Sequence, residues 1–244
     1  MRHFVTLLLL CFTFSLSAQI SFNNWGWGNE QITGNGEMTT ETRQLDGFDG
    51  VSTCCNIKVE LVQGAFSVKV KAESNLQEYI KTRVSGSRLE VGFYDKVSVK
   101  SRKDIIVYVS LPELDYVSAS SNGEITCQSM FTGDELDAQV SSGAAMWLAF
   151  MGDRLETSAS SGGRVEVRGA GNRIRADASS GGSVRAGDFT AKDGRCNASS
   201  GGGVTVNVSE DLNADASSGG SVRYAGNPSN VDTDTSSGGS VRRQ

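Results

Sequence analysis

Apolar and polar positions follow a fixed period around a repeated turn sequence in the second half of the chain. Each turn sequence is a pair of serines with glycine close behind, and the pairs begin at Ser120, Ser141, Ser160, Ser179, Ser199, Ser217 and Ser236. The steps between successive pairs are 18 to 21 residues long. A period of about 19 residues is typical of repeat proteins, in which each unit buries its apolar side only by stacking on its neighbours.

Alignment of the repeats on the first serine places apolar residues in the same columns of every repeat. The clearest column lies five residues after that serine and contains Ile125, Met146, Val165, Val184, Val204, Val222 and Val241. The columns one, three and five residues before the serine and seven after it are apolar or small, with exceptions such as Gly194 and Arg243. Polar columns separate them, and this period of two indicates strands with one buried face.

Each repeat therefore predicts two short strands joined by a bend at the serine–glycine sequence. Glycine suits the bend because it tolerates positive φ and close backbone approach. A third, looser segment, such as residues 169–172, closes the coil. A coil of about 19 residues has no room for two strands and a helix of about 11 residues with its loops. The predicted fold class is all-β, a parallel β-helix or β-solenoid, with the second serine of each pair inward in a ladder of hydroxyls.

The region before the repeats is also rich in strands but less regular. Strands are expected near 51–62, 66–71, 88–93 and 105–111, with a helical turn within 75–82. We interpret this region as an irregular β-rich cap, because the end of an open stack exposes edge strands that invite association. The predicted organisation is a signal peptide at 1–18, a partly flexible segment at 19–44, the cap at 45–115 and the regular solenoid at 116–244.

The first residues have the pattern of a secretion signal. Arg2 and His3 precede an apolar run over 4–16, and Leu16, Ser17 and Ala18 offer a small-residue cleavage site. The run is shorter than the roughly 20 residues that a membrane-spanning helix needs. We therefore expect an exported protein of the cell surface, the extracellular space or the periplasm, with no transmembrane segment after removal of the signal.

Charge and composition exclude several classes of function. The formal net charge is −5, and loss of Arg2 with the signal makes the chain one unit more negative. An acidic chain lacks the basic stripe that nucleic-acid binding needs. Removal of His3, the single histidine, excludes Ser-His-Asp catalysis and zinc bound by histidine. We expect no catalytic residues, no metal site and no cofactor.

Four cysteines follow the predicted signal, at Cys54, Cys55, Cys127 and Cys196. Neighbouring residues of one strand point to opposite faces, so we expect Cys54 and Cys55 not to bond to each other. An even number of cysteines in an exported chain is compatible with two separate disulfides. Buried free thiols are the equal alternative.

Candidate binding residues lie in two outward columns. Two residues before the first serine stands an acid and amide ladder, with candidates Asp177, Asn197, Asp215 and Asp234. Six residues after that serine stand Trp147, Arg185 and Arg223. The functional interpretation is a polar groove for glycans, with Trp147 as a platform for a sugar ring, or a cation site that uses the carboxylate oxygens. The alternatives are a solvated face that keeps the stack soluble, and a tryptophan that covers a bend or a subunit interface.

Several stretches resemble the autotransporter adhesin head domains, called GIN domains, of exported Bacteroidetes-type proteins. The matching segments are Gly47–Val51, Val59–Gly64, Glu73 with Asn75–Leu76, Tyr79–Ile80, and Val107–Leu111 followed by Pro112–Leu114. The serine–glycine repeats begin after that proline, as they do in the family. Cys54 and Cys55 depart from the pattern, because glycine or small polar residues usually stand there. The resemblance implies an exported β-helical adhesin and carries over no catalytic residue.

The sequence thus favours a non-enzymatic exported β-solenoid that binds a surface glycan or protein through ladders of side chains. One alternative is a structural envelope protein, or one that assembles into a homo-oligomer. A further alternative is a polysaccharide-active β-helix enzyme that uses clustered aspartates and arginines, because stacked aspartates lie near the carboxyl separation of about 5 Å found in retaining glycosidases.

Overall fold

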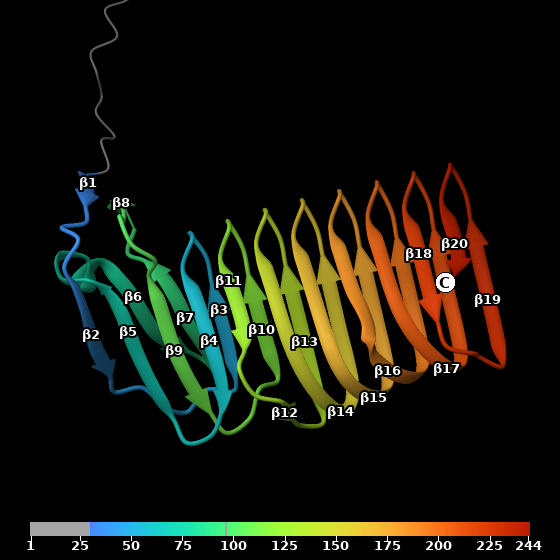
Figure 1. Ribbon diagram of the computed structural model, residues 1–244, viewed down its shortest axis with the longest axis horizontal. Helices are drawn as coiled ribbons and strands as arrows, with labels where there is room; N and C mark the ends of the chain where they lie inside the picture. The colour runs from blue at the N-terminus through green and yellow to red at the C-terminus, as the bar shows by residue number, and fades with distance from the viewer. Residues whose placement is uncertain (1–29, 96) are drawn as a thin grey trace, which may run out of the picture.

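The protein is an elongated stack of coils in which the serine–glycine turns line one long edge (Figure 1). The computed structural model describes residues 30–95 and 97–244. The predicted signal peptide at 1–18 and the first part of the segment at 19–44 lie outside the described residues. Within the described ranges, no helix is long and apolar enough to cross a membrane.

The regular half of the stack is built from parallel strands. These are β10 (Tyr116–Ala119), β11 (Glu124–Cys127), β12 (Phe131–Thr132), β13 (Glu135–Val140), β14 (Ala145–Ala159), β15 (Arg164–Ala178), β16 (Ser183–Ala198), β17 (Gly203–Ala216), β18 (Ser221–Ala225), β19 (Asn230–Thr235) and β20 (Ser240–Arg243). Val165, Val184, Val204 and Val222 pair directly with one another through successive strands. The predicted β-solenoid is therefore confirmed.

The inward columns form the core. All members of the valine column from Ile125 to Val222 are buried, and so are the small residues before the turns up to Ala216. Gly194, the glycine in an apolar column, leaves room for a neighbouring side chain, since a Cβ there would lie 2.6 Å from Cγ2 of Val208. The segment predicted to be loose, such as 169–172, is instead continuous strand within β15, and its first three residues pair with β14.

The turns correct one prediction. The second serines from Ser121 to Ser237 have φ between +48° and +52°, and six of the turns continue with a glycine at φ between +72° and +78°. The N–H of Gly163 donates to the carbonyl of Ser160 at 2.8 Å. Positive φ at both central residues with this bond is the geometry of a type I′ turn. It turns the second serine into solvent, so the predicted inward ladder of hydroxyls is wrong.

Along the edge of turns, backbone hydrogen bonds link each coil to the next. The N–H of Gly162 donates to the carbonyl of Ser180 in the next coil at 3.2 Å, and equivalent bonds link the other turns. The glycine that ends each turn lies against the preceding coil, and a Cβ at Gly182 would stand 2.3 Å from the carbonyl oxygen of Ala159. The glycines thus supply both the positive φ and the close approach that the sequence predicts.

The N-terminal region consists of β1 (Glu30–Thr33), β2 (Met38–Arg43), β3 (Gly50–Thr53), β4 (Lys58–Gln63), β5 (Ser67–Glu73), η1 (Ser74–Tyr79), β6 (Ile80–Ser85), β7 (Arg88–Phe93), β8 (Val97–Lys100) and β9 (Ile106–Leu111). The predicted helical turn is the 3₁₀ helix η1. Antiparallel pairs β2–β5, β5–β9 and β6–β7 lie at this end of the stack. By contrast, β3 and β4 pair in parallel with β10 and β11, so residues 50–63 add a coil to the repeat.

The cysteines correct a second prediction. Cys54 and Cys55 form a disulfide with each other, with a Cα–Cα separation of 3.8 Å. The argument from alternating strand faces does not apply to them, because they lie in the turn between β3 and β4, where Cys55 has φ +66°. Cys127 and Cys196 are buried free thiols in inward columns. Burial raises their pKa values, to about 11 for Cys127 and about 12 for Cys196.

Candidate binding site

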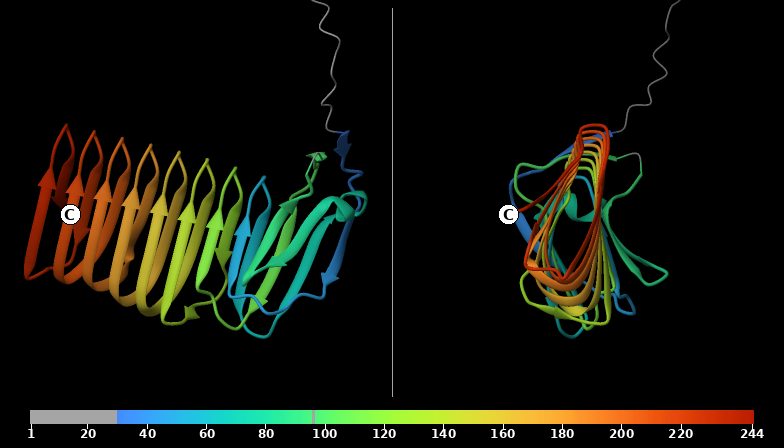
Figure 2. Two further views of the ribbon diagram at one scale, coloured as in Figure 1. Left: turned by 180° about the vertical axis from the view of Figure 1, so that it is seen from behind. Right: turned by 90° about the vertical axis from the view of Figure 1, so that its right-hand side faces the viewer.

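The predicted site residues lie on two opposite sides of the solenoid. Each coil runs up one side to its turn and down the other, as the end-on view of Figure 2 shows. The outward residues of the segments before the turns form the charged face, which contains Asp177, Asn197, Asp215 and Asp234. The outward residues after the turns form the tryptophan face, which contains Trp147, Arg185 and Arg223. No single site therefore joins the two predicted columns.

The charged face holds the acid and amide ladder in register. The Nδ2 of Asn197 donates to Oδ1 of Asp177 at 2.5 Å. Asp215 pairs in register with Asn197 on one side and with Asp234 on the other. The acid and amide ladder is thus present as predicted, and the carboxylate of Asp177 already accepts a hydrogen bond from a neighbouring rung.

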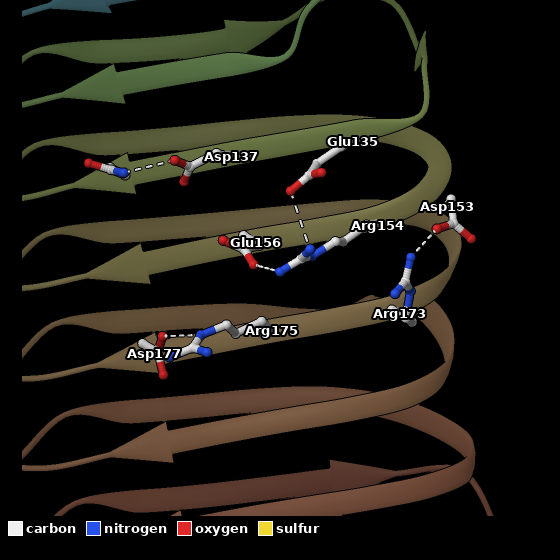
Figure 3. A network of polar contacts seen from close by, with 9 residues as sticks. Glu135, Asp137, Asp153, Arg154, Glu156, Arg173, Arg175 and Asp177 are labelled. Atoms are coloured by element: carbon white, nitrogen blue, oxygen red, sulfur yellow. Dashed lines mark hydrogen bonds and ion pairs between the residues drawn. The ribbon is translucent and has the colours of Figure 1, made fainter.

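Arginines neutralise much of this face (Figure 3). Arg175 pairs with Asp177 at 2.9 Å, and Arg173 pairs with Asp153 at 2.5 Å. Arg154 lies 3.6 Å from Glu135 and also pairs with Glu156. The side chains are one third to one half exposed, and ion pairs in such positions stabilise a fold by about 1 kcal/mol at most. The network therefore fixes the charge pattern of the surface more than it stabilises the stack.

The pKa values of two carboxylates on this face are shifted in opposite directions. Hydrogen bonds from Asn172 and Arg173 lower the pKa of Asp153. Burial raises the pKa of Asp137, although Nε2 of Gln139 donates to its carboxylate at 2.8 Å and opposes that shift. Acidification therefore neutralises Asp137 first and leaves the pair between Asp153 and Arg173 intact to lower pH.

A groove of about 740 Å³ lies on the charged face, further from the turns than the predicted ladder. Arg173, Arg175, Arg195, Asp193, Asp211 and Asn213 are among its lining residues. These residues belong to the columns four and six positions before the first serine, which are not among the candidate columns predicted from the sequence. Their signal in the sequence is the exchange of arginine for acid or amide from one repeat to the next.

A smaller cavity lies on the tryptophan face. Trp147 is 40% exposed and stands in register between Thr126 and Glu166 on the adjoining coils. Together these residues line a cavity of about 340 Å³ with Arg168 and Asp188. Leu148, Val167 and Cys127 also line the cavity and are buried members of inward columns. We name this cavity the Trp147 hollow. Arg185 and Arg223, from the predicted set, do not line it.

The two faces differ in how far their polar groups are already satisfied. On the charged face Asp153, Glu156 and Asp177 each pair with an arginine. Around the Trp147 hollow, the side chains of Glu166 and Asp188 make no ion pair or hydrogen bond with any residue that the structure describes. An aromatic ring with apolar neighbours and a few polar groups that have no protein partner is a common composition of a ligand pocket.

Neither face presents a metal centre in the part of the chain that the structure describes. No three acidic, cysteine or histidine side chains of residues 30–95 and 97–244 lie close enough together to hold a metal ion. The aspartates of the charged face are therefore spread along the axis rather than gathered at one point.

Stacked parallel coils with side chains in register define a β-solenoid protein, and comparison with known proteins gives its family. The profile described as putative auto-transporter adhesin, head GIN domain, matches residues 47–228. The chain therefore belongs to this family, as the sequence resemblance indicates. The chain has no match among the curated proteins.

Three solved structures share the fold. A putative adhesin from Bacteroides fragilis superposes with a TM-score of 0.78 at 16% identity, over 87% of this chain and 100% of that one. A putative adhesin from Parabacteroides merdae gives a TM-score of 0.70 at 21% identity, over 88% and 99%. A putative lipid binding protein from Parabacteroides distasonis gives a TM-score of 0.71 at 20% identity, over 88% and 100%. At these identities the likeness concerns the fold alone.

Proposed function

We propose that this protein is an exported, non-enzymatic adhesin that binds a surface glycan at the Trp147 hollow. Membership of the adhesin head family supports adhesion as the class of function. The observation that carries the site is a tryptophan that is 40% exposed at the wall of a cavity whose acidic residues have no partner among the described residues.

The chemistry of the hollow favours a sugar. A pyranose ring has a face of C–H groups that packs on an indole, and an edge of hydroxyls that needs donors and acceptors. Glu166 and Asp188 supply acceptors, and Arg168 supplies donors. The volume of about 340 Å³ lies at the lower end of the range for small-molecule sites, which suits one or two sugar units of a longer chain.

The solenoid holds these groups rigidly. Trp147 lies on β14, and Glu166 and Arg168 lie on β15, which pairs with β14 over fourteen residues from Ala145 to Ala159. Rigid presentation lowers the entropy cost of binding. The charged face flanks the opposite side and keeps the rod soluble.

Replacement of Trp147 by alanine is the direct test. On a glycan array we expect the wild-type protein to bind a defined set of sugars and Trp147→Ala to lose roughly tenfold or more in affinity for them, because the stacking contact is worth about 1.5 kcal/mol. Met151→Ala is the matched control, since Met151 is a 51% exposed apolar residue of the same strand that does not line the hollow.

The control variant should bind like the wild type. Binding that survives Trp147→Ala unchanged would place the site elsewhere. An array without any specific signal, with retention of the wild type on intact cells, would point to a protein partner instead of a glycan.

A further inference from the structure

The disulfide between Cys54 and Cys55 lies in a turn that does not require a cross-link. Thr53 pairs with Ala119, and Lys58 pairs with Glu124, so the two cysteines occupy the places of Ser120 and Ser121. The turn is closed by the equivalent backbone hydrogen bond in both coils. The N–H of Ile57 donates to the carbonyl of Cys54 at 3.1 Å, and that of Gly123 donates to Ser120 at 2.8 Å.

The backbone conformation agrees as well. Cys55 has φ +66° and Asn56 has φ +58°, while Ser121 and Asn122 have φ +48° and +62° without any disulfide. A disulfide stabilises a fold mainly by closing a loop in the unfolded chain, and that gain shrinks with the length of the loop. Adjacent cysteines close almost no loop, so stabilisation does not explain the pair.

One of the two cysteines lines an open cavity. Cys55 lines a cavity of about 380 Å³ together with Asn56 and Phe93. Cys54 packs toward the protein, since a Cβ on the buried Gly92 would lie 3.3 Å from its Sγ. Both cysteines of the pair are half-buried, but Cys55 lines this cavity and Cys54 does not. Cys55 is therefore the half of the disulfide that a molecule in the cavity would meet first.

A basic loop lines the same cavity. Lys100, Arg102 and Lys103 all contribute to its wall, and none of their side chains forms an ion pair with a described residue. Asp104 also lines the cavity, but its carboxylate is paired with Lys58 at 2.9 Å. The net charge of the whole chain is −5, which makes this local excess of cations a departure from the rest of the surface. Cations next to a sulfur stabilise its thiolate form and attract anions.

A buried carboxylate fixes this loop in place. Glu73 is 0% exposed and accepts hydrogen bonds from Oγ of Ser101 at 2.7 Å and from the N–H of Arg102 at 2.9 Å. Gly36 donates a third, at 2.6 Å. Burial disfavours the charged carboxylate, but these hydrogen bonds outweigh it and lower the pKa of Glu73. The loop is thus held in its position at neutral pH, where Glu73 is ionised.

We propose that the Cys54–Cys55 disulfide is a thiol-exchange site that captures anionic thiols as a mixed disulfide at Cys55. The incoming thiolate attacks Sγ of Cys55 and forms a new S–S bond as the bond between the two cysteines breaks. The electron pair of the broken bond goes to Sγ of Cys54, which becomes a thiolate in protonation equilibrium with the solvent. One disulfide replaces another, so no external oxidant or reductant is consumed.

The substrate class follows from the charge of the cavity. Lys100, Arg102 and Lys103 favour a thiol that carries carboxylates near its sulfur, in a small molecule or in an acidic segment of a protein. The capture is reversible, because the Cys54 thiolate stays beside the mixed disulfide and can expel the captured thiol. This site is independent of the Trp147 hollow and of glycan binding there.

The test is exchange of the folded, full protein with glutathione, an anionic thiol, and with cysteamine, a cationic one. After an alkylation quench, intact mass and peptide mapping should show the mixed disulfide on Cys55 and the alkyl group on Cys54. At equal thiolate concentration we expect glutathione to react about tenfold faster than cysteamine. The variant K100Q/R102Q/K103Q should remove most of that preference.

The chain supplies its own control for folding. In the variant C54S/C55S the turn regains the serine pair of the other coils, so it should melt within about 2 °C of the wild type and form no adduct. Absence of any adduct on the wild type, equal rates for the two thiols, or an adduct on Cys54 would each overturn the proposal. So would a large loss of stability in C54S/C55S, because the disulfide would then be a structural cross-link.

Discussion

Replacement of Val204 by aspartate should abolish folding or lower the free energy of unfolding by at least about 4 kcal/mol. Val204 is 1% exposed and packs between Val184 and Val222 of the neighbouring coils. A carboxylate there has no partner and no water, and each of its neighbours along the axis is a valine. Thermal denaturation followed by circular dichroism measures the effect.

Thr205→Asp is the matched control for this change. Thr205 is the next residue of β17, points outward, and pairs in register with Arg185 and Arg223. The same carboxylate then lies between two arginines in solvent, so stability should stay within about 0.5 kcal/mol of the wild type. A variant Val204→Asp that melts like the wild type would contradict the inward assignment of the whole column.

Replacement of Gly202 by alanine should lower the free energy of unfolding by about 3 kcal/mol, through backbone contact rather than through polarity. A Cβ at Gly202 would stand 2.4 Å from the carbonyl oxygen of Ala178 in the preceding coil. Neither backbone can move away without loss of the hydrogen bonds that link the coils, such as that from the N–H of Ser199 to the same carbonyl at 2.9 Å. We expect the melting temperature to fall by about 10 °C.

Gly203→Ala is the matched control, because it adds the same side chain at the next position without the close backbone contact. A Cβ at Gly203 would meet nothing nearer than Oγ of Ser221 at 3.8 Å. Gly203→Ala should therefore leave the melting temperature within about 2 °C of the wild type. Small effects at both positions would mean that the coils are not in contact at the turn, and large effects at both would mean that any added side chain destabilises it.

The sequence predicts the stack well because its columns repeat. A period of two inside a period of 18 to 21 residues specifies both the face of each strand and its neighbours, which is why the valine column was placed correctly. The resemblance to the GIN domain family is also confirmed, because the profile of that family matches residues 47–228. The stacked fold and the family membership are both predictable because each depends on many positions of the sequence at once.

The errors arose where backbone conformation interrupts the period. Extrapolation of strand alternation through the turn put Ser161 inside, whereas its φ of +49° turns the side chain outward. The same extrapolation separated Cys54 from Cys55, although both belong to a turn. The coil at residues 50–63 was missed as a repeat because cysteines replace its serines and Asn56 and Ile57 replace its glycines.

The candidate site was predicted in part. The exposed position of Trp147 follows from its outward column, but the cavity beside it needs Asp188, which a shift of register within β16 brings opposite Arg168. That shift of register depends on how the two strands pair, so the hydrophobic pattern of either strand alone does not predict it. The separation of the two candidate columns onto opposite sides likewise follows from the path of the coil and not from the columns themselves.

The most direct measurement of the stacked-coil account is a set of distances between spin labels at the turns. Labels are attached to cysteines placed at the exposed Ser121, Ser161 and Ser237 in the C54S/C55S background, and Cys55 shows that a cysteine fits this turn position. Four coil steps separate Ser161 from Ser237 and six separate Ser121 from it. At about 4.8 Å per step, stacked coils give distances of about 19 Å and about 29 Å. Distances that do not grow in proportion to the number of coils would contradict the stacked arrangement.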